Sequence, residues 1–339
     1  MAWEAGLRGP SGGPISVLSR KANAKRNSER YYRSRKYPHF LHFPLLLASV
    51  IGSFAVWTSS NLRHVYHGQI MKPGPASDSP FKGTTAVVTG ASSGIGRAIA
   101  IELACRGVDK MVVHFRQNKA GADQTAARLA ELGCQATTIA ADFNSADEIQ
   151  NLVQQSWQTL GSVQTWVNNA GADVLTGAAA HFSFDDKLRQ LLDVDLIGTI
   201  LLSRHVSARM LGQSSTSIPS ICFIGWDQAT RGMEGDAGQM FGPVKAAVLG
   251  YAKSLAQSLA PIVRVNLVAP GWIQTAWGQS TSDYWDGRAK AQALMERWGQ
   301  PQDVAAAVAF AADPANTFLT GQVIDVNGGW NRRFEGKTV

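Results

Sequence analysis

A glycine-rich turn carries the clearest chemical signal in this sequence. The turn TGASSGIG, Thr89 to Gly96, joins an apolar, β-branched run at residues 84–90 to a segment with helical apolar spacing at residues 95–107. Glycines in such a turn let the backbone approach a pyrophosphate, and the helix that follows offers free N–H groups and a positive dipole end. Many glycine turns only satisfy backbone sterics, but a strand before and a helix after provide the context that phosphate binding requires. We therefore predict a dinucleotide-binding turn.

The elements that must position this turn alternate between strands and helices. Short apolar runs rich in β-branched residues follow one another along the chain, and segments with a helical apolar period separate them. This alternation predicts an α/β fold: a Rossmann-type, doubly wound parallel sheet in a single domain of residues 81–339. The expected later strands are residues 110–115, 135–143, 163–171, 220–225, 262–271 and 322–329, and two of the expected helices are residues 122–133 and 147–161.

These motifs, in this order, resemble the short-chain dehydrogenase/reductase family over nearly all of residues 81–339. TGASSGIG is similar to the family's phosphate turn, NNAG (residues 168–171) to its sheet-stabilising segment, PGWIQT (residues 270–275) to the segment that closes on the nicotinamide, and LTGQVIDVNGG to its last strand. The resemblance implies a cofactor site made by Gly90, Ser92, Ser93, Gly94, Ile95, Gly96, Arg116, Asp142, Phe143, Asn169, Ala170, Gly171, Lys245, Pro270, Gly271, Ile273 and Thr275. Within this set, Asp142 matches the acid that contacts the adenine ring.

The end of the second predicted strand favours NADP(H) over NAD. In this fold an acid at that position binds the 2′-hydroxyl of NAD, whereas here Phe115 and Arg116 stand there. A guanidinium forks onto phosphate oxygens, so Arg116 can pair with the 2′-phosphate of NADP. The alternative is an arginine that only lies at the surface after a strand.

The catalytic positions that the resemblance implies are largely replaced. The family uses a tyrosine for proton transfer, a lysine four residues later, a serine that orients the carbonyl, and an asparagine that supports a relay water. Lys245 remains, but Phe241 stands at the tyrosine position and Asp195 at the asparagine position. The serine position falls on Trp226 or on one of Gly225, Asp227 and Gln228, none of which carries a hydroxyl. We therefore expect no intact catalytic set, because a benzene ring has no exchangeable proton. The alternative is a rearranged acid–base set of Asp195, Asp227 and Lys245.

The N-terminal 80 residues differ from the rest of the chain. They carry 11 Lys and Arg residues against three acids, and none of these four charged types occurs between Lys36 and Arg63. We predict a basic arm at residues 1–36, a single transmembrane helix at residues 37–62 and a linker at residues 63–80, because about 20 apolar residues span a bilayer. Two alternatives remain: a targeting segment whose apolar part is removed, and an apolar helix that packs on a partner protein.

Charge and cysteine content restrict the remaining interpretations. The basic residues belong to the arm rather than to the folded face, which disfavours nucleic-acid binding. Cys105, Cys134 and Cys222 form no CxxC pair, so we predict no metal site and expect all three to be buried as small apolar side chains.

Together these patterns predict a structural or accessory subunit of a membrane complex, located in the membrane of an organelle. Its active site is expected to be degenerate but to retain NADP(H) binding. The alternative is an active NADP(H)-dependent oxidoreductase with rearranged catalytic residues, and a third interpretation is a cofactor-sensing regulator. The sequence leaves open the side of the membrane, the identity of the other subunits and whether the chain forms homo-oligomers.

Overall fold

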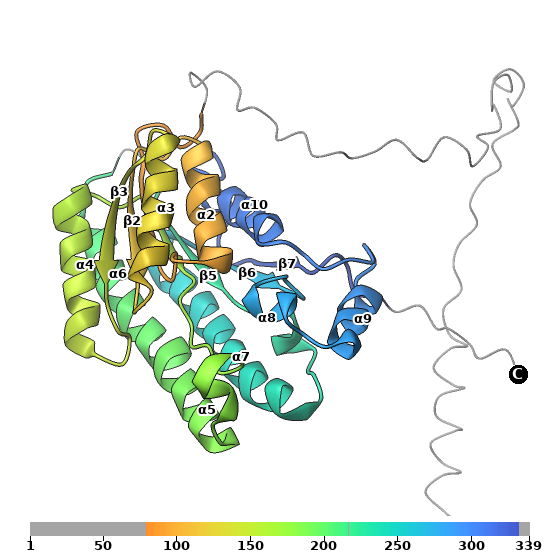
Figure 1. Cartoon of the computed structure of the whole chain (residues 1–339). Helices are drawn as coiled ribbons and strands as arrows, with labels where there is room; N and C mark the ends of the chain where they lie inside the picture. Colours follow the sequence, from red (N-terminus) through yellow and green to blue (C-terminus); the bar gives the residue numbers. More distant parts are fainter. Residues whose placement is uncertain (1–78, 216, 332–339) are drawn as a thin grey trace, which may run out of the picture. The chain divides into compact units, whose positions relative to one another are not determined.

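Seven parallel strands form the sheet that organises this protein (Figure 1). The computed structural model describes residues 79–215 and 217–331. The sheet order is β3-β2-β1-β4-β5-β6-β7, and every neighbouring pair is parallel. The strands are β1 (Thr85–Val88), β2 (Lys110–Phe115), β3 (Gln135–Ala140), β4 (Thr165–Asn168), β5 (Ser220–Ile224), β6 (Arg264–Pro270) and β7 (Val323–Val326). The predicted Rossmann-type sheet is thus confirmed.

Helices cover both faces of the sheet. The helices α2 (Gly94–Cys105), α3 (Lys119–Glu131) and α10 (Pro301–Ala312) share one hydrophobic core with the strands, and α4 (Ala146–Leu160), α6 (Thr199–Gly212) and α7 (Gly235–Leu259) share the other. Shorter elements lie near the carboxyl ends of the strands: α5 (Phe184–Leu191), the π-helical turn η2 (Leu192–Gly198), the 3-10 turns η1 (Gly177–His181) and η3 (Asp227–Thr230), α8 (Ala276–Gln279) and α9 (Asp283–Gln292).

The strands are apolar along their length because both of their faces are buried. In β1, Ala86 and Val88 pack into the core under α2, whereas Val87 packs into the core under α4 and α6. Val112 and its neighbour Val113 on β2 alternate in the same way. A central parallel strand therefore reads as a continuous β-branched run instead of alternating apolar and polar residues.

The chain direction across the sheet reverses beside β1, and this reversal positions the site. From β1 the chain moves outward to β2 and β3, and β4 then pairs with the other side of β1. Ligands of doubly wound sheets bind at such a switch point, outside the carboxyl ends of the strands. The turn at Thr89 to Gly96 follows β1 and therefore lies at this point.

One sequence-based expectation stays untested, and another was wrong for one residue. The predicted basic arm and transmembrane helix, and nearly all of the predicted linker, lie outside the described residues. Of the helices in residues 79–331 that the structure describes, none combines the length and hydropathy needed to cross a membrane. Cys134 and Cys222 are buried as expected, but the expectation for Cys105 was wrong: it is exposed, because it ends α2 on the side that faces away from the core.

Candidate functional site

The phosphate turn is locked to the loop after β4 by hydrogen bonds. The Thr89 hydroxyl accepts from the backbone N–H groups of Asn169 and Ala170, each at 2.9 Å. The Asn169 side chain donates to the carbonyl oxygens of Thr89 at 2.8 Å and Gly90 at 3.2 Å. The two segments predicted to flank a cofactor are therefore one rigid unit, although 80 residues separate them in sequence.

Two glycines of the turn occupy places that no side chain could share. Gly90 has a φ of 63°, and a Cβ atom there would lie 2.9 Å from the Cα of Ala170. A Cβ atom on Gly96 would lie 2.3 Å from the carbonyl oxygen of Gly90. The glycines thus allow the turn, the helix and the loop after β4 to pack at backbone distance, as a pyrophosphate cradle requires.

The N-terminus of α2 keeps its first N–H groups free of side-chain caps. Ser93 stands at the N-cap, and no side chain of the described residues accepts a hydrogen bond from the first turn. By contrast, Asn118, Ser145 and Ser183 cap α3, α4 and α5 through their side chains. Uncapped N–H groups need an acceptor, and an anionic ligand at this end of the helix supplies one.

A cleft of about 380 Å³ opens beside the turn, between the ends of β1, β2 and β4. Its walls bring together most of the predicted cofactor residues: Gly90, Ser92, Ser93, Arg116, Asp142, Phe143, Asn169, Ala170 and Gly171. Arg116 is exposed at the cleft edge and forms no ion pair with any residue of the described part of the chain. Its guanidinium is therefore available for a phosphate. Phe115, the residue before it, is buried.

His114 is a residue of this cleft that the sequence analysis missed. Its Nδ1 accepts a hydrogen bond from the backbone N–H of Gly90 at 3.1 Å, and its Nε2 lies 3.0 Å from the carbonyl oxygen of Ala141. These contacts assign the proton to Nε2. The ring also stacks on Phe143 with 4.8 Å between the ring centroids. Burial lowers the pKa of His114 from 6.5 to about 4, because the charged form would lose its water. A lone histidine in an apolar strand was the available signal.

Lys245 pairs with Asp195, the residue expected from the resemblance at the asparagine position. Lys245 Nζ lies 3.0 Å from Asp195 Oδ2, and the two side chains are 16% and 3% exposed. Asp195 Oδ1 accepts from the backbone N–H of Ala172 at 2.7 Å, which ties the pair to the loop after β4. Asp195 stands on η2, where the π-helical geometry displaces the side chains from their ordinary helical positions. A Cβ atom on Gly171 would lie 2.8 Å from Asp195 Oδ2, so the glycine makes room for the pair.

Phe241 and Trp226 stand at the wall of a second cavity, at the positions where the sequence predicts missing hydroxyls. Their rings meet edge to face, with 6.3 Å between the centroids. Tyr251, on the same helix as Phe241, lies elsewhere: it packs edge to face on Phe223 and donates to the Ile200 carbonyl oxygen. Tyr251 therefore has contacts of its own away from Phe241, and it is not among the residues that line the second cavity.

Of the alternative acid–base set of Asp195, Asp227 and Lys245, the first and last form an ion pair, and Asp227 has other contacts. Asp227 is buried on η3, where its Oδ2 accepts from Asn327 at 3.0 Å and lies 3.9 Å from the Arg231 guanidinium. Burial raises the pKa of Asp227 to about 6, and its Oδ1 has no hydrogen-bond partner within the described residues. Asp227 thus belongs to a network that joins β5 to β7, and only Asp195 and Lys245 are paired.

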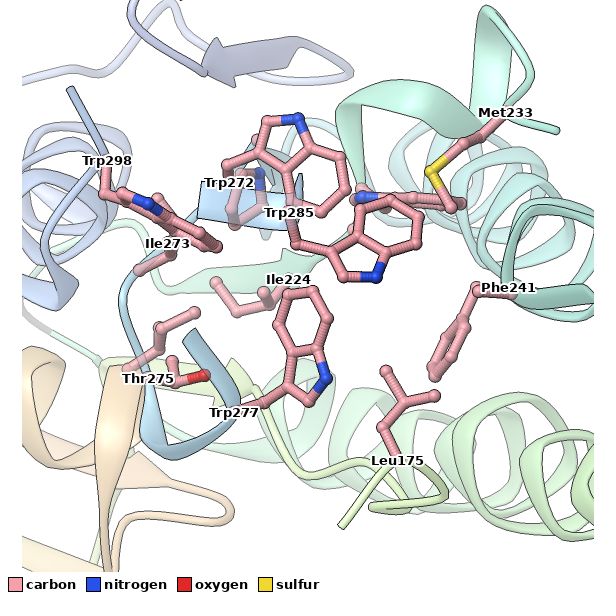
Figure 2. Close-up of a pocket in the computed structure, with 16 residues that line it drawn as sticks. Leu175, Ile224, Met233, Phe241, Trp272, Ile273, Thr275, Trp277, Trp285 and Trp298 are labelled. Carbon is pink, nitrogen blue, oxygen red and sulfur yellow. The ribbon is translucent and has the colours of Figure 1, made fainter. Parts of the chain in front are cut away.

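Tryptophans dominate the second cavity, which has a volume of about 480 Å³. The predicted residues Pro270, Gly271, Ile273 and Thr275 line it (Figure 2). Its five tryptophans are Trp226, Trp272, Trp277, Trp285 and Trp298. The last four lie close together in residues 272–298, and this crowding was a signal in the sequence for a shared aromatic site.

A third cavity, of about 390 Å³, shares lining residues with the cleft and with the tryptophan cavity, and we call it the passage. The passage is lined by Gly94, Ile95, Gly96, Asn169, Phe241 and Thr275. Ser93 and Asn169 line both the cleft and the passage, and Ile95, Phe241 and Thr275 line both the passage and the tryptophan cavity. The passage therefore adjoins both of the other cavities.

Comparison with known proteins gives consistent matches over the described domain. The family model for Enoyl-(Acyl carrier protein) reductase matches residues 90–331. A 3-oxoacyl-(acyl-carrier-protein) reductase of Synechocystis is 34% identical over 72% of this chain and 95% of its own length. The Staphylococcus epidermidis protein of that name is 33% identical over 72% of this chain and 98% of its own.

Solved structures agree with these matches. A short-chain dehydrogenase of Burkholderia cenocepacia in complex with NADP is 28% identical, with a TM-score of 0.66 over 74% of this chain and 98% of that one. A 3-oxoacyl-(acyl-carrier-protein) reductase of Brucella melitensis in complex with NAD is 26% identical, with a TM-score of 0.66 over 73% of this chain and 96% of that one. The names of these relatives favour the oxidoreductase alternative over the accessory-subunit interpretation.

Proposed function

This chain belongs to the short-chain dehydrogenase/reductase family, and we propose that it is an NADP(H)-dependent oxidoreductase that works without a tyrosine acid. The observation that carries this proposal is the passage from the nucleotide cleft to the tryptophan cavity, lined by Ile95, Phe241 and Thr275 on one side and Ser93 and Asn169 on the other. A protein that had kept only the fold would need neither an open cleft nor a cavity joined to it.

The residues present fit a nicotinamide dinucleotide. Gly90 and Gly96 keep the cradle at backbone distance, and the first turn of α2 lacks side-chain caps. Arg116 has no ion-pair partner in the described residues. A bound dinucleotide would supply or accept a hydride. Relatives solved with NADP and with NAD support a cofactor of this class, and Arg116 favours the phosphorylated form.

The chain's own residues position the reactants but move no proton at the substrate. Lys245 is oriented by Asp195 and can donate hydrogen bonds to a sugar hydroxyl, while Phe241 and Trp226 present only ring surface to the cavity. General acid–base catalysis contributes about 10²–10⁴-fold in rate, so reactions that need a proton at the substrate oxygen lose about this factor. Reactions that need only a hydride lose none of it.

Calorimetric titration tests the cofactor part of the proposal. We expect NADPH to bind more tightly than NADH, and Arg116→Ala to weaken NADPH binding about tenfold while leaving NADH unchanged, because a charge-assisted phosphate contact disappears. Arg128→Ala is the matched control, since Arg128 is an exposed arginine of α3 that pairs with Glu131 away from the cleft. Absence of dinucleotide binding, or a preference for NADH, would contradict the proposal.

A second candidate function is that of a subunit that holds the dinucleotide without turnover, within a membrane assembly. The edge-to-face contact between Trp226 and Phe241 favours it, because both rings line the tryptophan cavity and neither can transfer a proton. Gentle solubilisation of native membranes, followed by identification of the proteins that migrate with this chain, tests the assembly. Oxidation of NADPH by the purified protein with any acceptor from a broad apolar panel would exclude this candidate.

A further inference from the structure

Aromatic ring surface makes up most of the wall of the tryptophan cavity. None of its lining residues carries a charge, and its only side-chain hydroxyl belongs to Thr275. Its other side-chain donors are the indole N–H groups that the tryptophans bring to the wall. A ligand with an apolar outline and no strongly hydrated oxygen therefore suits this cavity better than a small alcohol does, because burying a hydrated oxygen costs free energy.

The indole rings form a rigid, closely packed wall. Trp272 and Trp277 stack at 6.2 Å with an interplanar angle of 23°, and Trp298 meets both edge to face at 6.0 Å and 6.2 Å. Trp285 packs at 61° against Trp277 from helix α9. In Figure 2 these labelled rings and Phe241 surround one hollow. Their faces carry the negative part of the aromatic quadrupole.

The same cluster already binds one cation. The Arg288 guanidinium lies 5.8 Å from the ring centroid of Trp272 and 5.2 Å from that of Trp285. Two hydrogen bonds to the Glu234 carboxylate neutralise this arginine, so it adds no net positive charge beside the cavity. The indole is the best cation–π partner among side chains, and the attraction is largest where water is excluded.

Hydrogen-bond acceptors outside the cavity engage two of its indole N–H groups. The Asp286 carboxylate accepts from the Trp298 indole N–H at 2.9 Å, and the Gln292 amide oxygen accepts from that of Trp272 at 2.8 Å. Both acceptors belong to α9, which holds these rings in place. With their N–H groups engaged, Trp298 and Trp272 offer the cavity ring surface instead of donors.

We infer that the tryptophan cavity binds an apolar organic cation, specifically an iminium ion whose nitrogen carries two alkyl groups. This inference rests on the proposed function and names its substrate class. Reduction of an iminium ion by a reduced nicotinamide dinucleotide forms one C–H bond from the hydride, moves the C=N π pair onto nitrogen and yields a neutral tertiary amine. The step consumes no proton, so Phe241 at the tyrosine position costs it nothing.

Calorimetry on the full-length protein with two ligands of equal shape tests the binding. Phenyltrimethylammonium and tert-butylbenzene differ by the replacement of a quaternary nitrogen with carbon. We expect the cation to bind at least about tenfold more tightly, because desolvated cation–π contacts exceed what the neutral isostere gains. Equal affinities, tighter binding of the neutral ligand or no binding of either ligand overturns the inference.

Variants assign the preference to this cavity. Trp277→Leu and, on the helix α9, Trp285→Leu keep apolar bulk but remove a ring, so we expect the cation-to-neutral affinity ratio to fall severalfold while the neutral ligand still binds. Phe318→Leu is the matched control, because Phe318 is fully exposed and does not line the cavity. A ratio that stays unchanged in both tryptophan variants overturns the assignment.

A separate readout distinguishes this inference from the proposed function. NADPH oxidation is followed with N-methyl-3,4-dihydroisoquinolinium, a permanently charged iminium ion. Selective cation binding without turnover contradicts the oxidoreductase proposal and leaves the cation site standing. Turnover of neutral acceptors alone, without cation selectivity, supports the oxidoreductase and overturns the cation site.

Discussion

The buried histidine at the cofactor cleft makes the stability of this protein depend on pH in a defined way. His114 is 2% exposed, and its neutral ring accepts from Gly90 and donates to Ala141. Burial lowers its pKa from 6.5 to about 4 in the folded protein. Between these values the unfolded chain binds a proton that the folded chain does not. His114 therefore lowers the free energy of unfolding as the pH falls from about 6.5 to about 4, by about 3 kcal/mol in total at about 1.4 kcal/mol for each pKa unit.

Asp227 acts with the opposite sign in nearly the same range. Burial raises its pKa from 3.8 to about 6, so the folded protein holds a proton that the unfolded chain has released. Its contribution is present below about pH 4 and is lost as the pH rises through about 6, again by about 3 kcal/mol. The two residues therefore offset each other in the wild-type protein, and only variants reveal either one.

Urea denaturation at steps between pH 4 and pH 7, followed by circular dichroism, measures both effects. We expect Asp227→Asn to steepen the loss of stability toward low pH, because His114 then acts alone. We expect His114→Gln to remove that loss. The free energy of unfolding of this variant then falls as the pH rises from 4 to 6, because Asp227 acts alone. His205→Gln is the control, since His205 is exposed on α6. If the difference between wild type and His114→Gln is independent of pH, the buried-neutral assignment of His114 is wrong.

Three further predictions follow from the site and from the N-terminal sequence. Lys245→Met leaves the Asp195 carboxylate buried without its cation, so we expect a loss of about 3 kcal/mol of unfolding free energy in urea. Combining Lys245→Met with Asp195→Asn should recover most of this loss. A Lys245→Met variant as stable as the wild type would refute the pairing. Phe241→Tyr together with Trp226→Ser supplies the two hydroxyls expected from the resemblance, and we expect the rate of aryl ketone reduction with NADPH to rise about 100-fold. Phe241→Tyr alone should gain little. A wild-type rate on this ketone equal to that of the double variant would contradict the prediction. Deleting residues 1–75 is expected to yield a domain that is soluble without detergent. The full chain should resist carbonate extraction from membranes if it has an integral anchor, and should be released by high salt if only its basic arm binds. A full chain that is soluble and monomeric without detergent would exclude both kinds of attachment.

The sequence alone determined the fold and the phosphate turn, because both are written in local patterns. Alternating β-branched runs and helical apolar segments predicted the sheet. The turn from Thr89 to Gly96 was recognisable because it lies between a predicted strand and a predicted helix. Gly90 at positive φ is one position where the backbone itself dictates the residue. The loss of a tyrosine at Phe241 and of a serine at Trp226 or a neighbouring residue stays a prediction, based on the spacing from Lys245 and on a strand end.

Only the tertiary structure decided which distant residues meet. The bond from Gly90 to His114, the pairing of Asp195 with Lys245 and the bond from Asn327 to Asp227 depend on how crossovers bring together segments 24 to 100 residues apart. The apolar periodicity of a helix or strand predicts which of its faces is buried, but it does not predict which side chains of other elements that face contacts. The tryptophans of residues 272–298 were visible as a cluster in sequence, yet their closure around one cavity requires α9 to fold back over the end of β6, a long-range contact that no local pattern encodes.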